Sequence, residues 1–256
     1  MRQFNSTSHY FSQRDELSRK AKAHTLEMDM KYPNEISASI QDTRVYSDAF
    51  NIARGSRVEM IVERADSVSA VLAHATEGNT VAVANFASYK YPGGMFFQGS
   101  KAQEECLCHE STLYNVISKM NEYYEWNNQN KNKALYTNRA LYSKNIVFER
   151  DENKVFCDVI TCAAPNYKAA YTYQRVSAEE NSKVLRSRIN FIKNVLEKEG
   201  VDVFIFGAFG CGVFGQNPEE VAQICKEEFA KSSTIKKVYF SIIDEKTTNA
   251  FKKVIG

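Results

Sequence analysis

The chain has 256 residues, of which 43% are apolar and 25% charged, and its 33 basic and 31 acidic side chains leave a formal net charge of +2. This length suits one large domain, and the composition allows a sizeable core. The small net charge excludes a general attraction to nucleic acid or anionic membranes, so any anion site must be built locally.

The N-terminal third is predicted to be mostly helical. Residues 12–30 are rich in charge and in good helix formers, which predicts one or two helices ending at Tyr32-Pro33. Residues 34–75 are mixed, with a predicted strand near 58–62 and a predicted helix near 67–75. We interpret residues 1–75 as a helical extension packed on a core formed by residues 76–256.

From residue 80 onward, predicted strands and helices alternate. The predicted strands cover residues 80–86, 146–148, 154–162, 203–206 and 238–243. The predicted helices cover residues 103–124, 178–198, 218–231 and a last segment to 254. This order predicts a largely parallel sheet with helices on both faces. Ligands of such sheets bind at the carboxyl ends of the strands, which is where two glycine-rich loops lie.

The first glycine-rich loop spans residues 87–102 and leads into Gln103-Glu104-Glu105. Its glycines, Gly93 and Gly94, allow close backbone approach, and the helix start favours an anion. A plain strand–helix turn, with glutamates favoured by the helix dipole, fits the loop equally well.

The adjacent glutamates favour a functional site. Neighbouring side chains on a helix point about 100° apart, which predicts a division of labour. One carboxylate would hold a sugar hydroxyl. The other, in a drier place, would have a raised pKa and donate a proton to a leaving oxygen.

The second glycine-rich loop, residues 207–215, carries four glycines directly after a predicted buried strand. Its backbone N–H groups can wrap a diphosphate, and the rings of Phe209 and Phe214 can contact a base or a ribose. The glycine spacing is neither the dinucleotide fingerprint nor a nucleophile elbow. Cys211 is therefore predicted to be a small buried residue rather than a nucleophile.

Polar residues also stand where two other predicted strands end, in Asn85-Phe-Ala-Ser88 and in Ala164-Pro165-Asn166. Asn85 can hydrogen-bond a ribose hydroxyl or tie down the loop backbone, and the sequence leaves both roles open.

Other polar clusters favour structural interpretations. Cys106-x-Cys108-His109 lacks the second ligand pair that a structural zinc site needs, and Cys106 is predicted to lie on the core-facing stripe of a helix. The basic residues of this region are interpreted as solvated surface charges: Lys90, Lys101, Arg139 and Lys144.

The two glycine-rich loops and the two strand-end segments, in their order along the chain, resemble the corresponding parts of the bacterial-type, or microbial, poly(ADP-ribose) glycohydrolases of the macrodomain superfamily. The family signature is three glycines, a short spacer and Gln-Glu-Glu. Here it stands as Gly93-Gly94-Met95, seven spacer residues and Gln103-Glu104-Glu105. The resemblance covers roughly residues 10–250. Met95 departs from the third glycine, a change expected to affect efficiency and chain-length preference more than the fold.

The resemblance implies a three-layer α/β/α macrodomain with a mixed, largely parallel central sheet and an N-terminal helical extension. It implies that Glu105 is the catalytic acid and base and that Glu104 orients the ribose. Phe214 would position the terminal ribose, and no metal or cofactor is expected. The expected substrate-binding residues are Asn85, Gly93, Gly94, Gln103, Gly207, Ala208, Gly210, Cys211, Gly212, Val213 and Phe214.

The implied activity is hydrolysis of the ribose–ribose O-glycosidic bonds of poly(ADP-ribose), with release of ADP-ribose. The expected partners are ADP-ribose, its polymer and ADP-ribosylated macromolecules. No signal peptide or membrane-spanning run is visible, so we expect a cytoplasmic monomer without a membrane partner. Two alternatives stay open: a module that binds ADP-ribose without cutting it, and a hydrolase of mono-ADP-ribosyl groups or O-acetyl-ADP-ribose.

Overall fold

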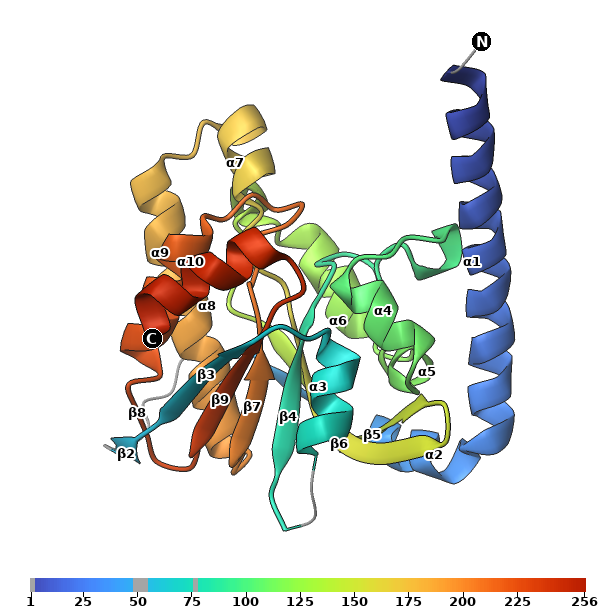
Figure 1. The fold of residues 1–256 in the computed structure, drawn as a ribbon, viewed down its shortest axis with the longest axis horizontal. Helices are drawn as coiled ribbons and strands as arrows, with labels where there is room; N and C mark the ends of the chain where they lie inside the picture. Colours follow the sequence, from blue (N-terminus) through green and yellow to red (C-terminus); the bar gives the residue numbers. More distant parts are fainter. Residues whose placement is uncertain (1–2, 48–54, 76–77) are drawn as a thin grey trace.

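A seven-stranded sheet forms the centre of the computed structural model, which describes residues 3–47, 55–75 and 78–256 (Figure 1). The strand order is β1-β5-β6-β4-β7-β9-β3. The strands are β1 (Arg44–Tyr46), β3 (Glu59–Glu63), β4 (Val81–Phe86), β5 (Ala140–Arg150), β6 (Asn153–Cys162), β7 (Val203–Phe206) and β9 (Lys237–Ser241). The five strands from β6 to β3 run parallel, while β5 runs antiparallel to β6 and to β1. A separate short pair joins β2 (Ser56–Arg57) to β8 (Lys231–Ser232).

Both faces of this sheet are buried under helices. In β4, Val81 and Val83 belong to one apolar cluster and Ala82 and Ala84 to the other, as the two-residue period of a strand requires. The second cluster also contains α8 (Ala178–Lys198), α9 (Pro218–Glu228) and α10 (Glu245–Ile255). The first contains α3 (Ser67–His74), α4 (Gln103–His109), α5 (Leu113–Ile117) and α6 (Asn121–Gln129). In Figure 1, α9 and α10 lie on the left and α4 to α6 on the right. The predicted three-layer α/β/α fold with a mixed, largely parallel sheet is confirmed.

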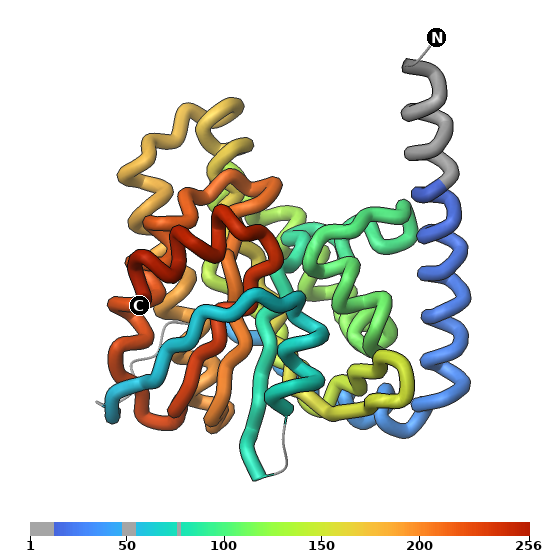
Figure 2. The backbone as a smooth tube through the Cα atoms, viewed as in Figure 1, coloured from blue at the N-terminus to red at the C-terminus, as the bar shows by residue number. Residues whose placement is uncertain are grey.

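The N-terminal segment contributes helices and strands. Helix α1 (Gln3–Lys31) stands at the edge of the molecule, beside the loop that carries the short helix η1 (Phe96–Gln98), and α2 (Pro33–Asp42) follows it (Figure 2). Strands β1 and β3 then form the two edges of the central sheet. The division into residues 1–75 and 76–256 stays a prediction, and the sheet runs across it.

The predicted helix over residues 103–124 is wrong as a continuous element, because it is divided into α4, α5 and α6. The first break is caused by β5. The Thr112 N–H donates to the Val147 carbonyl at 3.0 Å, the Glu149 N–H donates to the Glu110 carbonyl at 2.9 Å, and Ser111 forms a β-bridge with Phe148. Residues 110–112 thus pair with a strand instead of continuing the helix.

Two further differences concern the helices. Cys106 is half-buried, whereas Leu107 and Cys108 are fully buried, so the core-facing stripe of α4 is not the predicted one. Helix α7 (Tyr167–Gln174), which the sequence did not predict, begins at Asn166, whose side chain accepts from the Ala169 N–H. None of the helices in the described ranges combines the length and apolar character that a membrane crossing needs.

Candidate active site

The predicted site residues meet at the carboxyl ends of the parallel strands, where open α/β sheets hold ligands. Asn85 is the penultimate residue of β4, and the first glycine-rich loop connects that strand to Gln103-Glu104-Glu105 at the start of α4. The second loop follows β7, which is the neighbour of β4 in the sheet. The fold therefore places both loops at one edge of the sheet, as predicted.

Glu104 is held by two donors in a buried position. The Ser88 N–H donates to its Oε2 at 2.6 Å, and Asn85 Nδ2 donates to its Oε1 at 3.2 Å. Only 3% of Glu104 is exposed, and this burial raises its pKa to about 8, although both donors act in the opposite direction. Glu104 is thus a carboxyl group whose two oxygens are both fixed and whose pKa is raised by burial.

Glu105 is equally buried but only half anchored. The Met95 N–H donates to its Oε1 at 2.8 Å, whereas its buried Oε2 has no hydrogen-bond partner among the described residues. One oxygen of Glu105 is therefore fixed while the other can exchange a proton with a bound molecule. The two carboxyl groups are therefore held differently, which agrees with a division of labour between them.

The glycines of the first loop are required by close contacts. Gly94 has φ +59°, and a Cβ there would lie 2.6 Å from Glu105 Oε1 and 2.9 Å from Glu104 Oε2. Gly93 has φ +69°, and a Cβ there would lie 2.7 Å from the ring of Tyr114. The backbone thus passes directly over both carboxyl groups. These carboxyl groups accept hydrogen bonds from N–H groups of the loop, which the sequence predicts to hold an anion.

Met95 has no such requirement. Its φ of −109° suits any residue, and half of its side chain is exposed. A glycine is therefore unnecessary here for backbone geometry, and the N–H group of Met95 still reaches Glu105.

Gln103 connects the start of α4 to β4. Its Nε2 donates to the Ala84 carbonyl at 2.7 Å and to Ser67 Oγ at 3.0 Å, and its Oε1 accepts from the Phe86 N–H at 2.8 Å. Both of its donor hydrogens are therefore used within the protein. These contacts are typical of a residue that positions the two glutamates rather than one that contacts substrate.

The second glycine-rich loop presents free backbone donors. The N–H groups of Gly210, Gly212, Val213 and Phe214 have no hydrogen-bond partner among the described residues. Gly212 and Val213 form its exposed tip, and a Cβ on Gly212 would meet nothing within 4 Å. A row of free N–H groups at a strand end is suited to the oxygens of a diphosphate.

The aromatic and sulfur side chains of this loop have different environments. Phe209 is fully buried in the core, so the ligand contact considered for it is wrong, whereas Phe214 is half-buried. Burial raises the pKa of the Cys211 thiol to about 12. A thiol is a poor nucleophile when it cannot ionise, which agrees with the predicted structural role of Cys211.

Several residues near the site were not predicted. Thr161 Oγ1 lies 3.3 Å from Asn85 Nδ2 and helps to orient that side chain. The rings of Tyr89 and Tyr136 stack with centroids 4.1 Å apart, and Tyr136 also lies 6.2 Å from Phe214. Tyr136 has a left-handed backbone and follows a polar loop, so no periodic pattern marks it.

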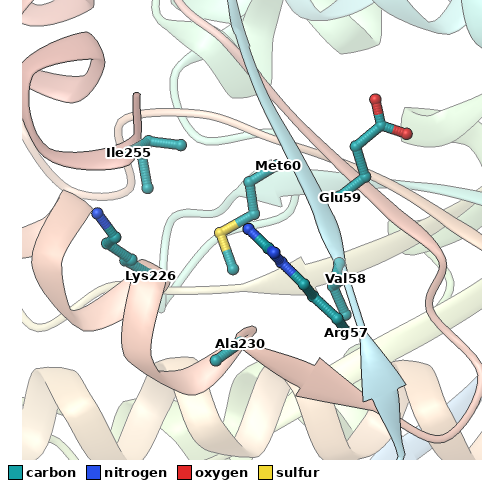
Figure 3. Close-up of a pocket in the computed structure, with 7 residues that line it drawn as sticks. All are labelled: Arg57, Val58, Glu59, Met60, Lys226, Ala230 and Ile255. Carbon is teal, nitrogen blue, oxygen red and sulfur yellow. The ribbon is translucent and has the colours of Figure 1, made fainter.

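Among the described residues, the cysteine and histidine candidates do not form a metal site, and a pocket at the far end of the sheet is separate from the glutamates. No group of three or more His, Cys, Asp or Glu side chains in the described ranges is arranged to hold a metal ion. A surface pocket of about 470 Å³ lies at the amino end of β3, between that strand, α9 and α10 (Figure 3). None of the predicted site residues lines this pocket, which lies at the opposite end of the sheet from the glutamates.

Comparisons with known proteins give the same fold and point to one family. The family model described as "Microbial-type PARG, catalytic domain" matches residues 14–151. A comparison with curated proteins gave no match.

Two solved structures illustrate the likeness. The poly(ADP-ribose) glycohydrolase from Thermomonospora curvata is 25% identical with a TM-score of 0.83, over 94% of this chain and 99% of that chain. The enzyme from Deinococcus radiodurans, in complex with ADP-ribose, is 29% identical with a TM-score of 0.79, over 88% of this chain and 98% of that chain.

Proposed function

The chain belongs to the microbial-type poly(ADP-ribose) glycohydrolases, and on that premise we propose how its site hydrolyses the ribose–ribose bonds of poly(ADP-ribose) to release ADP-ribose. The observation that carries the proposal is the buried pair formed by Glu104, which is fixed at both oxygens, and Glu105, which is fixed at one. A glycosidase needs a group that holds the sugar and a group that moves a proton.

The free oxygen of Glu105 is the proposed proton carrier. Protonated Glu105 donates to the leaving ribose oxygen as the glycosidic bond breaks, and an oxocarbenium-like ribose forms. The resulting carboxylate then takes a proton from the attacking water, which restores the acid. Glu104 and Asn85 hold the ribose hydroxyls during both steps.

The second glycine-rich loop is proposed to hold the diphosphate through the N–H groups of Gly210, Gly212, Val213 and Phe214. The half-buried ring of Phe214 packs on the terminal ribose. Gly207, Ala208 and Cys211 shape the loop backbone. The proposed targets are ADP-ribosylated macromolecules in the cytoplasm, on which the chain acts as a monomer. Family membership is what supports these assignments.

The test compares wild type with Glu105→Gln on poly(ADP-ribosyl)ated protein, with release of free ADP-ribose as the measurement. Gln keeps an oxygen acceptor for the Met95 N–H but cannot donate the proton, so the rate should fall by about 10²–10⁴-fold. Binding of ADP-ribose should persist. Glu125→Gln, on the exposed surface of α6, is the matched control.

The alternatives give different results. If the wild type binds ADP-ribose but releases none, the chain is a binding module. If it acts only on mono-ADP-ribosyl or O-acetyl-ADP-ribose substrates, the proposed substrate is wrong although the site is catalytic.

A further inference from the structure

A second pocket, of about 320 Å³, adjoins the active site, and it is lined by three lysines. Lys90 comes from the loop after β4, and Lys131 and Lys133 come from η2 (Asn132–Ala134) and the residue before it. Tyr136, Asn166 and Gln174 complete the polar part of its lining, which contains no acidic residue. A concave surface of this composition is suited to an anion.

The lysine charges are largely available to a ligand. Neither Lys90 nor Lys131 has a side-chain partner among the described residues. Lys133 lies 3.2 Å from Glu180, but the two side chains are 56% and 43% exposed. An ion pair this exposed is worth about 0–1 kcal/mol, so a bound anion can replace Glu180 as the partner of Lys133.

A buried cation beneath the pocket adds to its positive potential. Arg188 is fully buried and donates to the Ala163 carbonyl, to the Leu135 carbonyl at 3.3 Å and to Asn138 Oδ1 at 2.8 Å. All of these acceptors are uncharged, so no carboxylate neutralises Arg188 there. Leu135 and Ala163 directly adjoin the segments that form the pocket wall.

The wall itself is held in an unusual backbone conformation. Four residues of one short segment have positive φ: Asn132 (41°), Lys133 (54°), Ala134 (67°) and Tyr136 (63°). Such strain is uncommon in non-glycine residues and persists where the surrounding structure fixes it. Here the Asn166 N–H donates to the Ala134 carbonyl at 2.9 Å, and Asn132 Nδ2 donates to the Tyr136 carbonyl at 3.0 Å. The loop thus presents its lysines in a defined position.

The strand order tells which part of a substrate reaches this pocket. The second glycine-rich loop follows β7, on one side of β4. The pocket is built from segments that adjoin β4, β5 and β6, on the other side of β4. Tyr136 lines the pocket and also lies 6.2 Å from Phe214, which we propose packs on the terminal ribose. The pocket therefore adjoins the proposed position of the cleaved ribose, and the chain that continues from that ribose can reach the lysines.

We propose that the pocket lined by Lys90, Lys131 and Lys133 binds the diphosphate of the neighbouring ADP-ribose unit, on the leaving-group side of the cleaved bond. This inference rests on the proposed function, because it assumes where the terminal unit lies. It gives the chain a second contact that a single ADP-ribose cannot make, and so a preference for polymer.

The test measures binding in a Glu105→Gln background, so that the ligand stays intact. The probes are ADP-ribose and an oligomer of two ADP-ribose units. Replacing Lys131 and Lys133 together by Ala should raise the Kd of the two-unit oligomer about tenfold or more. Replacing the same two lysines by Arg should keep most of the affinity. For this oligomer, the slope of log K against log salt should fall by roughly 1.4, at about 0.7 for each lost phosphate contact on a flexible strand.

The control pair is Lys231→Ala with Lys246→Ala, two exposed lysines that line neither pocket. Equal binding of the two-unit oligomer by the Lys131/Lys133 variant and its parent would overturn the proposal. An equal loss of affinity for ADP-ribose would also overturn it, and so would a loss of affinity for single-stranded RNA without a loss for the oligomer. Release of ADP-ribose by the otherwise unchanged enzyme is measured separately, so failure of the pocket and failure of the glycohydrolase function give different patterns.

Discussion

Gly94 is the residue on which the arrangement of both carboxyl groups depends most directly. Its backbone is left-handed, and a Cβ would lie within 3 Å of an oxygen from each glutamate. Gly94→Ala should therefore add a backbone cost of about 1–2 kcal/mol and also displace both side chains. Since a misplacement of about 1 Å can cost 10²-fold in rate, we expect kcat/KM to fall at least that far.

Gly200→Ala is the matched control, because Gly200 has φ +75° and no atom within 4 Å of an added Cβ. It should lose similar stability in thermal unfolding but keep its activity. If the two variants lose activity equally, the contact between Gly94 and the carboxyl groups is not what limits catalysis.

For individual residues, the sequence predicts chemical roles better than it predicts contacts. The adjacency of Glu104 and Glu105 predicted two different roles, one carboxyl group holding a sugar hydroxyl and the other donating a proton. The sequence could not predict the raised pKa of Glu104, since it results from burial, which outweighs the opposing effect of the donors Asn85 and Ser88. Gln103 was expected to contact substrate, but its donor hydrogens bind Ala84 and Ser67.

Among the elements, helix α1 stabilises the first glycine-rich loop. Ser18 Oγ donates to the Phe97 carbonyl at 2.6 Å, and Arg14 Nε donates to the Gln98 carbonyl at 3.0 Å. These carbonyls belong to η1, which directly follows Met95, the residue whose N–H holds Glu105. The helix thus fixes the far side of the loop that positions the proposed acid.

Ser18→Ala tests this support. Loss of one hydrogen bond should lower the free energy of unfolding by about 1 kcal/mol, and the looser loop should lower kcat by roughly threefold or more. Ser37→Ala, at an exposed position on α2, should change neither quantity. A loss of stability without any change in kcat would show that α1 braces the fold but not the site.

Elements were predictable where local pattern decided them. Strand β4, helix α8 and the two glycine-rich loops lie close to their predicted positions because burial alternation, caps and glycines are local signals. The division of residues 103–124 was not predictable, since residues 110–112 pair with β5, a strand more than thirty residues away in the sequence.

For the whole molecule, the N-terminal segment is built into the sheet. Residues before 76 supply β1 and β3, which cover the outer edges of β5 and β9, and buried side chains such as Ala21, Ile36 and Val71. A chain truncated to residues 76–256 would expose both sheet edges and part of its core. Such edges promote aggregation, so we expect no cooperative thermal transition.

Removal of residues 1–31 alone is the comparison, because that chain keeps every strand of the sheet. It should fold with a lower Tm, as it loses the packing of α1. A soluble 76–256 chain with cooperative unfolding would instead support a self-sufficient core.

Asn85 Oδ1 is a buried acceptor atom that has no hydrogen-bond partner among the described residues. A sugar is rich in hydroxyl donors, so this unmatched oxygen beside the two glutamates is suited to a ribose hydroxyl group. Sites of this kind reject an analogue that lacks the matching hydroxyl far more strongly than an apolar pocket rejects a missing methylene. The enzyme would thereby distinguish ribose from deoxyribose at the cleaved bond, and the folded protein carries that selectivity as a standing cost to its own stability.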